Sequence, residues 1–299
     1  MVMLNSNLLN QIDSFSALRV LVIGEAMLDS YLEGSTDRLC REAPVPVVSI
    51  TARDHQPGGA ANTAVNVRSL GAEVAFLSVI GDDPEGITLL QTLDSSEVPG
   101  EHILVDPDRS TLAKQRVIAS SQMVVRFDQG STLPLSPGTE ESLIQHLETL
   151  FPTCDAVVVS DYDYGILTPR VIQALAALQA TEPRVVVVDS KRLPDYRAVR
   201  ITAVKPNYEE ALQILGLRKA SSIDERIDQI SGHGERILEI TGAPLAAVTL
   251  DEDGALIFES GSAPYRTYAR PQPHTRAAGA GDTFVSAFTL ALAAGAHTE

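Results

Sequence analysis

The chain has 299 residues, 44% of them hydrophobic, and a formal net charge of −16, so it can bury a full core in one large α/β domain or two smaller ones. The acidic balance argues against nucleic acid and anionic membranes as partners, because both require basic patches. Met1–Asn5 carries no charged leader, no apolar run could span a membrane, and Cys40 and Cys154 fit no ligand pattern, so we expect a cytoplasmic protein with reduced cysteines.

Short β-branched runs alternate with helical patterns along the chain, which indicates an α/β fold with a parallel sheet covered by helices on both faces. The expected strands are Leu18–Ile23, Val74–Val79, Ala156–Val159, Arg184–Val188, Ile201–Val204 and Ala246–Thr249. The expected helices are Ala60–Leu70, Glu85–Leu93, Glu140–Leu150, Pro169–Ala180, Tyr208–Leu215 and Ile223–Thr241.

Two stretches interrupt this rhythm. Tyr31–Ile50 and Thr111–Phe127 read as extended segments, and the second alternates around Ser120-Ser121 like a hairpin. We expect them to form a small antiparallel sheet that acts as a lid over the carboxyl ends of the parallel strands, where ligands of open α/β sheets bind. Two ordinary surface hairpins are the alternative.

Polar groups follow the first strand and begin the first helix. Asp29 comes just past the first strand, where it would hold a polar ligand or cap a turn. Gly58 and Gly59 let the backbone approach a ligand closely, and Asn62 offers both a donor and an acceptor. A plain glycine turn before a helix is the alternative for this second motif.

Further polar motifs follow later strands. Ser160–Tyr162 and Asp189–Lys191 lie on the expected ligand edge, and Lys191 is a candidate phosphate contact unless these are only solvated loop charges. Asn207 and Glu210 either form a helix capping box or hold Mg²⁺ and its water, since that ion prefers oxygen ligands.

A last strand and turn come before the C-terminal region. Thr249 ends a strand and Gly254 precedes the next one, a pattern that also fits a hairpin turn. A role beside a nucleotide depends on their place in the order of motifs.

Small residues lead into an acid at Ala278–Asp282, and an apolar helical pattern follows. A loop with so few side chains leaves its backbone N–H groups free at a helix N-terminus, where unpaired donors and the helix dipole attract anions. An aspartate at an anion site is electrostatically unusual unless it takes a proton from a reactant. Asp282 therefore favours phosphoryl transfer.

Taken in order, these motifs resemble the PfkB (ribokinase-like) family of carbohydrate kinases over essentially the whole chain from Leu18. Gly58–Gly81 fits the N-terminal signature of that family, Gly279–Asp282 fits its C-terminal signature, and Asn207–Glu210 fits its N-x-x-E motif. The segment Glu42–Val48 lies outside these signatures and is similar to the subgroup that phosphorylates heptose 7-phosphate for ADP-heptose synthesis.

The resemblance implies a three-layer α/β/α sandwich with a mostly parallel central sheet and a small β-lid. It implies a single kinase domain over residues 1–299, with lid segments near 31–50 and 111–127, and a homodimer formed through the lids. ATP would be the phosphate donor, Mg²⁺ the cofactor, and a small sugar or sugar phosphate the acceptor.

The resemblance also assigns roles to residues. Asp282 would be the base that accepts the proton of the sugar hydroxyl. The amides of the preceding loop would form the anion hole for the γ-phosphate: Gly279, Ala280 and Gly281. The sugar would be held by Asp29, Gly58, Gly59 and Asn62. The nucleotide and metal side would be lined by Lys191, Asn207, Glu210, Thr249 and Gly254.

Three cations, Lys114, Arg116 and Arg126, fall in the expected lid. They would meet a phosphate that is already on the sugar, although solvent-facing strand cations are the alternative. The expected reaction is conversion of heptose 7-phosphate to heptose 1,7-bisphosphate.

The chain departs from the family pattern just before Gly279. Arg276 stands where the family usually has Asp, and Ala278 where it has Thr. In relatives that Asp helps to bind a monovalent cation, so we expect the guanidinium to replace the ion or the site to be absent, and activity to be independent of K⁺. The family usually continues with further helices, so we expect the chain to lack the C-terminal end of the fold.

A carbohydrate kinase is the first hypothesis. A non-catalytic relative that binds sugar or nucleotide is the second, and it is motivated by Arg276, Ala278 and the short C-terminus. A dinucleotide-binding oxidoreductase is poorly supported, because the residues after the first strand, Gly24–Met27, do not fit the G-x-G-x-x-G pattern.

Overall fold

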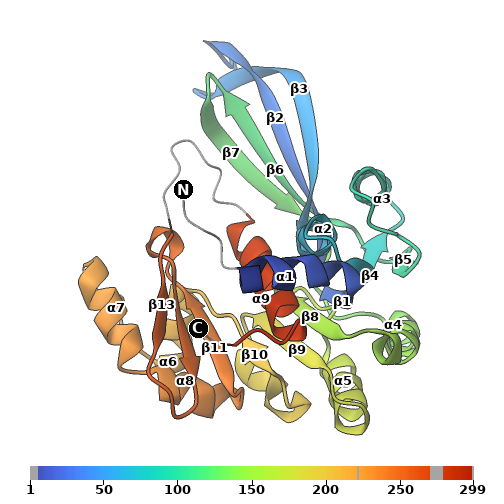
Figure 1. Cartoon of the computed structure of the whole chain (residues 1–299). Helices are drawn as coiled ribbons and strands as arrows, with labels where there is room; N and C mark the ends of the chain where they lie inside the picture. The colour runs from blue at the N-terminus through green and yellow to red at the C-terminus, as the bar shows by residue number, and fades with distance from the viewer. Residues whose placement is uncertain (1–5, 221, 270–278, 298–299) are drawn as a thin grey trace.

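A computed structural model describes residues 6–220, 222–269 and 279–297. Within this part of the chain a nine-stranded sheet forms the centre of the molecule (Figure 1). Its strands lie in the order β13 (Tyr265–Thr267), β12 (Ala255–Glu259), β11 (Leu245–Thr249), β10 (Ala203–Val204), β9 (Val185–Ser190), β8 (Ala156–Asp161), β1 (Arg19–Gly24), β4 (Glu73–Gly81) and β5 (Ile103–Asp106). Only the pairings of β12 with its two neighbours are antiparallel among these strands, so the expected mostly parallel sheet is confirmed.

The central strands are buried on both faces because their apolar side chains alternate between two cores. In β1, Val20 and Val22 belong to one hydrophobic cluster, whereas Leu21 and Ile23 belong to the other. Successive side chains of a strand point to opposite faces, so a continuous apolar run requires cover on both sides.

Helices supply that cover and make three layers. The face that holds Val20 is covered by α2 (Ala60–Ser69), α3 (Pro84–Ser95) and α9 (Ala280–Ala293). The opposite face is covered by α4 (Pro137–Leu150), α5 (Pro169–Thr181), α6 (Tyr208–Leu215), α7 (Ile223–Ser231) and α8 (Gly234–Thr241). The expected α/β/α sandwich is therefore confirmed, and a short helix, α1 (Ser6–Ser14), precedes it.

Four 3₁₀ turns connect the elements of the described chain: η1 (Phe15–Ala17), η2 (Phe151–Thr153), η3 (Leu193–Val199) and η4 (Asp251–Asp253). The expected strand Ile201–Val204 is shorter than its sequence predicts. Arg200 adopts a left-handed conformation at the end of η3, so pairing begins only at Ala203.

The prediction of a single helix over Ile223–Thr241 is wrong. The structure has two helices here, α7 and α8, with a short turn between them. A Cβ built at Gly234 would lie 2.0 Å from the ring of Phe258 on β12. Only glycine lets the start of α8 approach the sheet this closely.

A second sheet of four strands has the order β3-β2-β6-β7 and stands away from the central sheet in Figure 1. Its strands are β2 (Ala26–Leu39), β3 (Pro46–Gly59), β6 (Leu112–Ala119) and β7 (Gln122–Gln129). We call it the lid. The lid is mixed rather than antiparallel as expected, because β2 pairs with β6 in parallel. Ser120 and Ser121 both have positive φ, which gives the expected hairpin the twist of a type I′ turn.

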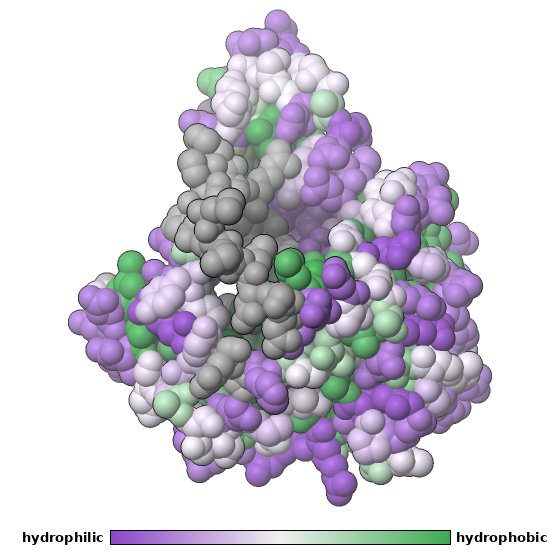
Figure 2. Space-filling view, in the orientation of Figure 1, coloured by the Kyte–Doolittle hydropathy of each residue, from purple (hydrophilic) through white to green (hydrophobic). Residues whose placement is uncertain are grey.

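The surface agrees with the acidic composition. In Figure 2 hydrophilic residues dominate the viewed face, and apolar residues are scattered over it. Both cysteines are free thiols, as expected, and Cys154 is buried. No helix in the described ranges is long and apolar enough to cross a membrane.

Candidate functional site

A pocket of about 180 Å³ opens at the carboxyl ends of β8 and β9, beside the N-terminus of α9. It lies where ligands of open α/β sheets bind. Several sequence-predicted residues lie together here: Lys191, Asn207, Glu210, Gly279, Gly281 and Asp282. Asp161, Tyr162, Asp189 and Lys205 also line the pocket.

Asp282 is buried, 6% exposed, in the first turn of α9. Asn62 of α2 donates its side-chain N–H to Oδ2 of Asp282 at 2.7 Å. The hydroxyl of Tyr162 donates to Oδ1 at 2.9 Å. Each carboxylate oxygen thus has one donor and a second lone pair that remains able to accept a proton.

Burial raises the pKa of Asp282 to about 6, and Asp189 adds to the increase. The hydrogen bonds from Asn62 and Tyr162 and the positive charge of Lys205 lower it again, but do not offset the burial. A carboxyl group with a pKa near 6 is largely ionised at neutral pH and is a stronger base than an ordinary aspartate.

The loop before Asp282 begins the helix. Gly279 precedes α9 with φ 87°, a left-handed conformation that glycine adopts without strain. Gly279 and Gly281 line the pocket, while Ala280 is exposed. The first amides of a helix have no acceptor within the helix, so this turn presents donors and the positive end of the helix dipole to the pocket.

A buried ion pair lies beside this turn. Nζ of Lys205 is 3.0 Å from Oδ2 of Asp189, and Lys205 is only 4% exposed. Burial lowers the pKa of Lys205, but the charge and hydrogen bond of Asp189 offset this and raise it overall. A Cβ built at Gly281 would lie 3.3 Å from Nζ of Lys205, so a protonated amine stands next to the N-terminus of α9.

Asn207 and Glu210 form the capping box of α6, which was the alternative left open by their spacing. Oδ1 of Asn207 accepts from the amide of Glu210 at 2.9 Å, and Oε2 of Glu210 accepts from the amide of Asn207 at 2.8 Å. Both residues also line the pocket. Capping therefore fixes two oxygen-bearing side chains at its wall.

Thr249 and Gly254, the other two residues expected on the nucleotide side, differ in their position relative to the pocket. Thr249 ends β11 and forms a β-bridge with Asn207, so it is adjacent to the pocket wall. Gly254 has φ 89°, and a Cβ there would lie 2.2 Å from the carbonyl oxygen of Thr267. The tight turn between β11 and β12 explains why position 254 is glycine. Gly254 is not among the described residues that line the pocket.

On the lid side, Asp29 and Arg116 pair with each other, with 2.6 Å between Oδ1 and Nη1. A Cβ at Gly58 would lie 2.4 Å from Oδ2 of Asp29, so glycine makes room for this carboxylate. Gly59 precedes α2 with φ 57°. The structure thus brings the expected sugar-side residues Asp29, Gly58 and Arg116 together, while Asn62 lies against Asp282.

Two lysines converge on a pair of stacked tyrosines. Nζ of Lys114, from β6 of the lid, is 5.4 Å from the ring centre of Tyr162 and 5.9 Å from that of Tyr164. Nζ of Lys191, from the core, is 5.3 Å from the ring centre of Tyr164. Two ammonium groups around one ring repel each other, and an anion placed between them would relieve this. Arg126, in contrast, pairs with Asp128 on the exposed strand β7.

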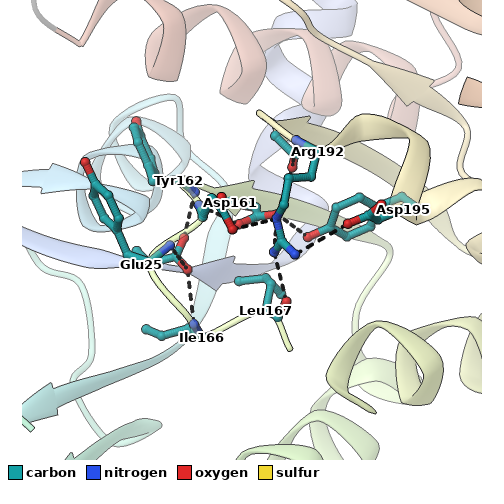
Figure 3. A network of polar contacts seen from close by, with 11 residues as sticks. Glu25, Asp161, Tyr162, Ile166, Leu167, Arg192 and Asp195 are labelled. Atoms are coloured by element: carbon teal, nitrogen blue, oxygen red, sulfur yellow. Dashed lines mark hydrogen bonds and ion pairs between the residues drawn. The ribbon is translucent and has the colours of Figure 1, made fainter. Parts of the chain in front are cut away.

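A buried polar network lies behind Tyr162 (Figure 3). Glu25 is fully buried and accepts from the amides of Tyr162, Tyr164 and Ile166 at 2.7, 3.3 and 3.2 Å. Burial and the neighbouring charge of Asp161 raise the pKa of Glu25 to about 7.

Asp161 anchors the other side of this network. Its Oδ2 accepts from Ser190, Arg192 and Tyr196 at 2.7, 3.1 and 2.8 Å. Figure 3 shows the guanidinium of Arg192 reaching toward both Asp161 and Leu167. The network therefore ties the chain after β8 to the chain after β9.

The sequence analysis placed Tyr162 and Asp189 on the expected ligand edge without giving them roles, and it did not select Lys205 or Glu25 as site residues. Asp189 and Lys205 directly follow predicted strands, and Glu25 and Tyr162 lie two and three residues beyond them, so position at the carboxyl edge of the sheet was the available signal. Arg276 and Ala278, on which the expectation about K⁺ depends, lie outside the described residues.

Solved structures support the fold. The chain is similar to phosphofructokinase-2 from Escherichia coli in complex with substrates and products, with a TM-score of 0.75 and 21% identity over 94% of this chain and 88% of that one. It is also similar to ribokinase from Cryptococcus neoformans var. grubii serotype A in complex with ADP, with a TM-score of 0.68, 22% identity and the same coverage of both chains. At these identities the likeness shows a ribokinase-like fold.

Curated relatives are more similar in sequence. The chain is 36% identical over 283 residues to the bifunctional protein HldE of Desulfatibacillum aliphaticivorans and to that of Geobacter sulfurreducens. These matches cover 94% and 93% of this chain but only 57% and 56% of the relatives, so the chain spans little more than half of their length. The family model for pfkB family carbohydrate kinases matches residues 17–299. The chain therefore belongs to the pfkB family of carbohydrate kinases.

Proposed function

We propose that this chain catalyses ATP-dependent phosphorylation of a sugar hydroxyl, with Asp282 as the base. The observation that carries the proposal is a buried carboxylate in the first turn of α9, beside a protonated lysine and a glycine-rich helix start. Phosphoryl transfer needs groups that stabilise the anionic phosphoryl group and, next to them, a base that accepts the hydroxyl proton. This arrangement contains both.

Each of these residues has a separate role in the proposed reaction. Asp282 accepts the hydroxyl proton as the oxygen attacks phosphorus, and its remaining lone pairs can take that proton. The amides of Gly279, Ala280 and Gly281 and the amine of Lys205 stabilise charge on the transferred group. The transition state is loose, so the hydroxyl loses its proton late and an aspartate is basic enough.

The donor set fits a hydrated Mg²⁺ better than a metal held by protein alone. Within the described residues no three His, Cys, Asp or Glu side chains form a metal cluster, and Mg²⁺ commonly keeps several waters. Asn207 and Glu210 would hold it through water at the pocket wall, where Lys191 and Thr249 would meet the nucleotide. When bound, Mg²⁺ supplies charge neutralisation between the phosphates.

The acceptor proposed is a sugar phosphate, with heptose 7-phosphate as the best candidate and heptose 1,7-bisphosphate as its product. Lys114 supports an acceptor that brings its own phosphate, because its ammonium group lies beside Tyr162 and Tyr164 and has no ion-pair partner among the described residues. Asp29, Gly58, Gly59 and Asn62 would hold the sugar hydroxyls. The resemblance of Glu42–Val48 and the HldE relatives favour heptose over other sugars.

We also propose that the protein works in the cytoplasm, where ATP is available. Two copies would form a dimer through their lids. Met123, Val125 and Phe127 alternate on β7 and are 60%, 48% and 42% exposed. Substituting Val125→Glu is expected to convert a dimer into a monomer in sedimentation velocity, whereas Val105→Glu, on the exposed side of β5, leaves the dimer intact. A monomeric parent chain would contradict this arrangement.

The decisive test measures ATP turnover with a panel of sugars and sugar phosphates, with heptose 7-phosphate first. Asp282→Asn is expected to lower kcat by about 10²–10⁴, the usual contribution of a general base, while ATP binding is retained. Asp94→Asn on α3, an exposed acid outside the pocket, is the matched control. A parent chain that binds ligands but turns over none of them would favour a non-catalytic relative.

The acceptor phosphate is tested separately. Lys114→Met is expected to raise KM for the phosphorylated acceptor about tenfold or more, as expected for a lost charge-assisted contact, and to change KM for ATP little. Arg126→Met on the same lid is the control, since Arg126 pairs with Asp128 on an exposed strand. Equal effects on phosphorylated and unphosphorylated sugars would show that Lys114 does not meet the phosphate.

A further inference from the structure

Tyr162 is the residue in contact with the base that the family motifs do not account for. Its hydroxyl lies 2.9 Å from Oδ1 of Asp282, while Asn62 reaches Oδ2 from the other side. Burial and the nearby carboxylates raise the pKa of Tyr162 well above its ordinary value. The hydroxyl therefore stays neutral and serves as a donor to the base at every working pH.

The segment that carries Tyr162 is not a helix or strand, so something else must fix its position. Glu25 accepts three amides of residues 162–166 through both of its oxygens. Arg109, 8% exposed, donates to the carbonyl of Tyr164 at 2.6 Å. A buried carboxyl group and a buried guanidinium thus hold the N–H and C=O groups of the same loop.

A fully buried carboxylate is costly unless hydrogen bonds compensate for its lost hydration. The core could have satisfied this loop with water or a neutral side chain. Instead Glu25 is kept beside Asp161, whose charge opposes its ionisation. Such a costly arrangement, next to the pocket, indicates that the loop must be rigid for function rather than for the fold alone.

We propose that Glu25 and Tyr162 act in series as positioning residues: Glu25 fixes the 162–166 loop, and Tyr162 holds the carboxylate of Asp282 in the plane needed to accept the proton. With Asn62 on Oδ2 and Tyr162 on Oδ1, rotation of the carboxylate would break both hydrogen bonds. This inference rests on the proposed kinase activity with Asp282 as the base.

The first test removes only the hydroxyl, in Tyr162→Phe. Loss of a hydrogen bond to a charged group is expected to lower kcat about ten- to a hundredfold, with KM for ATP nearly unchanged. The acid limb of the pH profile should move to higher pH, because Tyr162 stabilises the ionised form of Asp282.

The other groups that face Asp282 remain in place in this variant: Asn62 from α2, Asp189 from β9 and Lys205 after β10. Tyr196→Phe is the matched control, since it removes another buried hydroxyl that donates to a carboxylate, that of Asp161. It is expected to lower the melting temperature without moving the acid limb. If Tyr162→Phe behaves like this control, Tyr162 has only a structural role.

The second test asks whether Glu25 acts through Tyr162. Glu25→Gln keeps the shape but replaces one acceptor oxygen by an N–H₂ group that faces amide donors, so we expect a drop in kcat of about tenfold. The double variant Glu25→Gln/Tyr162→Phe is expected to match Tyr162→Phe alone, because the loop then no longer carries the hydroxyl. If the losses in kcat of the two single variants multiply in the double variant, Glu25 does not act through Tyr162.

The two proposals fail in different ways. If Asp282→Asn turns over as fast as the parent chain, the proposed function is wrong. If Asp282→Asn is inactive but Tyr162→Phe matches the parent in kcat and pH profile, only the positioning role is wrong. The titration of the ¹³C-labelled carboxyl of Asp282 by NMR tests Tyr162 without any substrate: its midpoint is expected to rise in Tyr162→Phe, and an unchanged midpoint would contradict the proposal.

Discussion

The site has two sides that are built differently. On the core side, Asp282, Asp189 and Lys205 are largely buried, and their charged groups are satisfied by one another or by neighbouring side chains. On the lid side, Arg126 and Asp128 form a pair whose side chains are 52% and 42% exposed, and all of β7 is exposed, although Arg116 and Asp29 are more enclosed. Buried charges cannot move without a large penalty, whereas exposed pairs rearrange easily. We therefore expect the core side to determine kcat and the lid side to determine acceptor KM.

The largest effect is expected from breaking the buried pair of the core side. Lys205→Met leaves Asp189 without its partner, which should cost about 3–5 kcal/mol in the free energy of unfolding. It also removes the amine beside α9, so kcat should fall about 10²–10³. Chemical denaturation and ATP turnover measure the two losses.

A double variant separates these two effects. Lys205→Met/Asp189→Leu replaces the whole pair by apolar groups and should recover most of the stability without recovering kcat. Recovery of both would mean that Lys205 has only a structural role, and the distinction between the two sides would then fail at its strongest point.

A smaller effect concerns the cost, in the free energy of unfolding, of burying the carboxylate of Asp282. The pKa of Asp282 is raised from 3.8 to about 6 in the folded chain, so between these values the folded chain binds a proton that the unfolded chain releases. Its contribution to the free energy of unfolding therefore falls as pH rises from about 4 to 6, and the cost is complete above pH 6. Asp282→Asn should raise stability by about 1–3 kcal/mol at pH 7.

Thermal unfolding at several pH values checks this prediction. The advantage of Asp282→Asn over the parent chain should shrink toward zero as pH is lowered to about 4, while Asp94→Asn shows no such trend. An inactive variant that is less stable than the parent at pH 7 would show that the hydrogen bonds from Asn62 and Tyr162 outweigh the burial of the charge.

The lid side is tested at Arg116. Arg116→Gln leaves Asp29 without a cation, so the carboxylate is expected to be less well placed for the acceptor and KM for the sugar should rise about tenfold. Turnover at saturating acceptor should change by less than threefold. A large drop in kcat with unchanged KM would remove the functional difference between lid and core.

Most of the core and many of the pocket residues could be predicted from the sequence, because their signals lie in short, continuous segments. Val20–Ile23 is apolar at every position, so a doubly covered strand was the natural prediction, and Gly279–Asp282 carries its chemistry within four consecutive residues. Glu25 and Tyr162 could not be selected in this way. They meet across 137 residues of chain, and only the fold brings them together.

Local pattern also failed where long-range packing decided the outcome. The helix expected over 223–241 is interrupted just before Gly234, which packs against the ring of Phe258 on a strand that comes later in the chain. The parallel pairing of β2 with β6 likewise joins segments that are separated by two helices and three strands. The pairing of β2 with β6 leaves no signal in the neighbouring residues, whereas Gly232 and Gly234 were a local signal for a break in the helix.

The smallest expected effect concerns monovalent cations. Arg276 stands in the sequence where the family usually has the Asp that helps to bind such an ion, and we propose that its positive charge disfavours a cation. Replacing Na⁺ by K⁺ at constant ionic strength is therefore expected to change turnover by less than about twofold, the range left for non-specific screening. Arg276→Asp should introduce a K⁺ response if charge alone excludes the ion. Stimulation of the parent chain by several-fold in K⁺ would instead mean that the cation binds despite Arg276, and that the anion-attracting end of α9 depends on it as well as on Lys205.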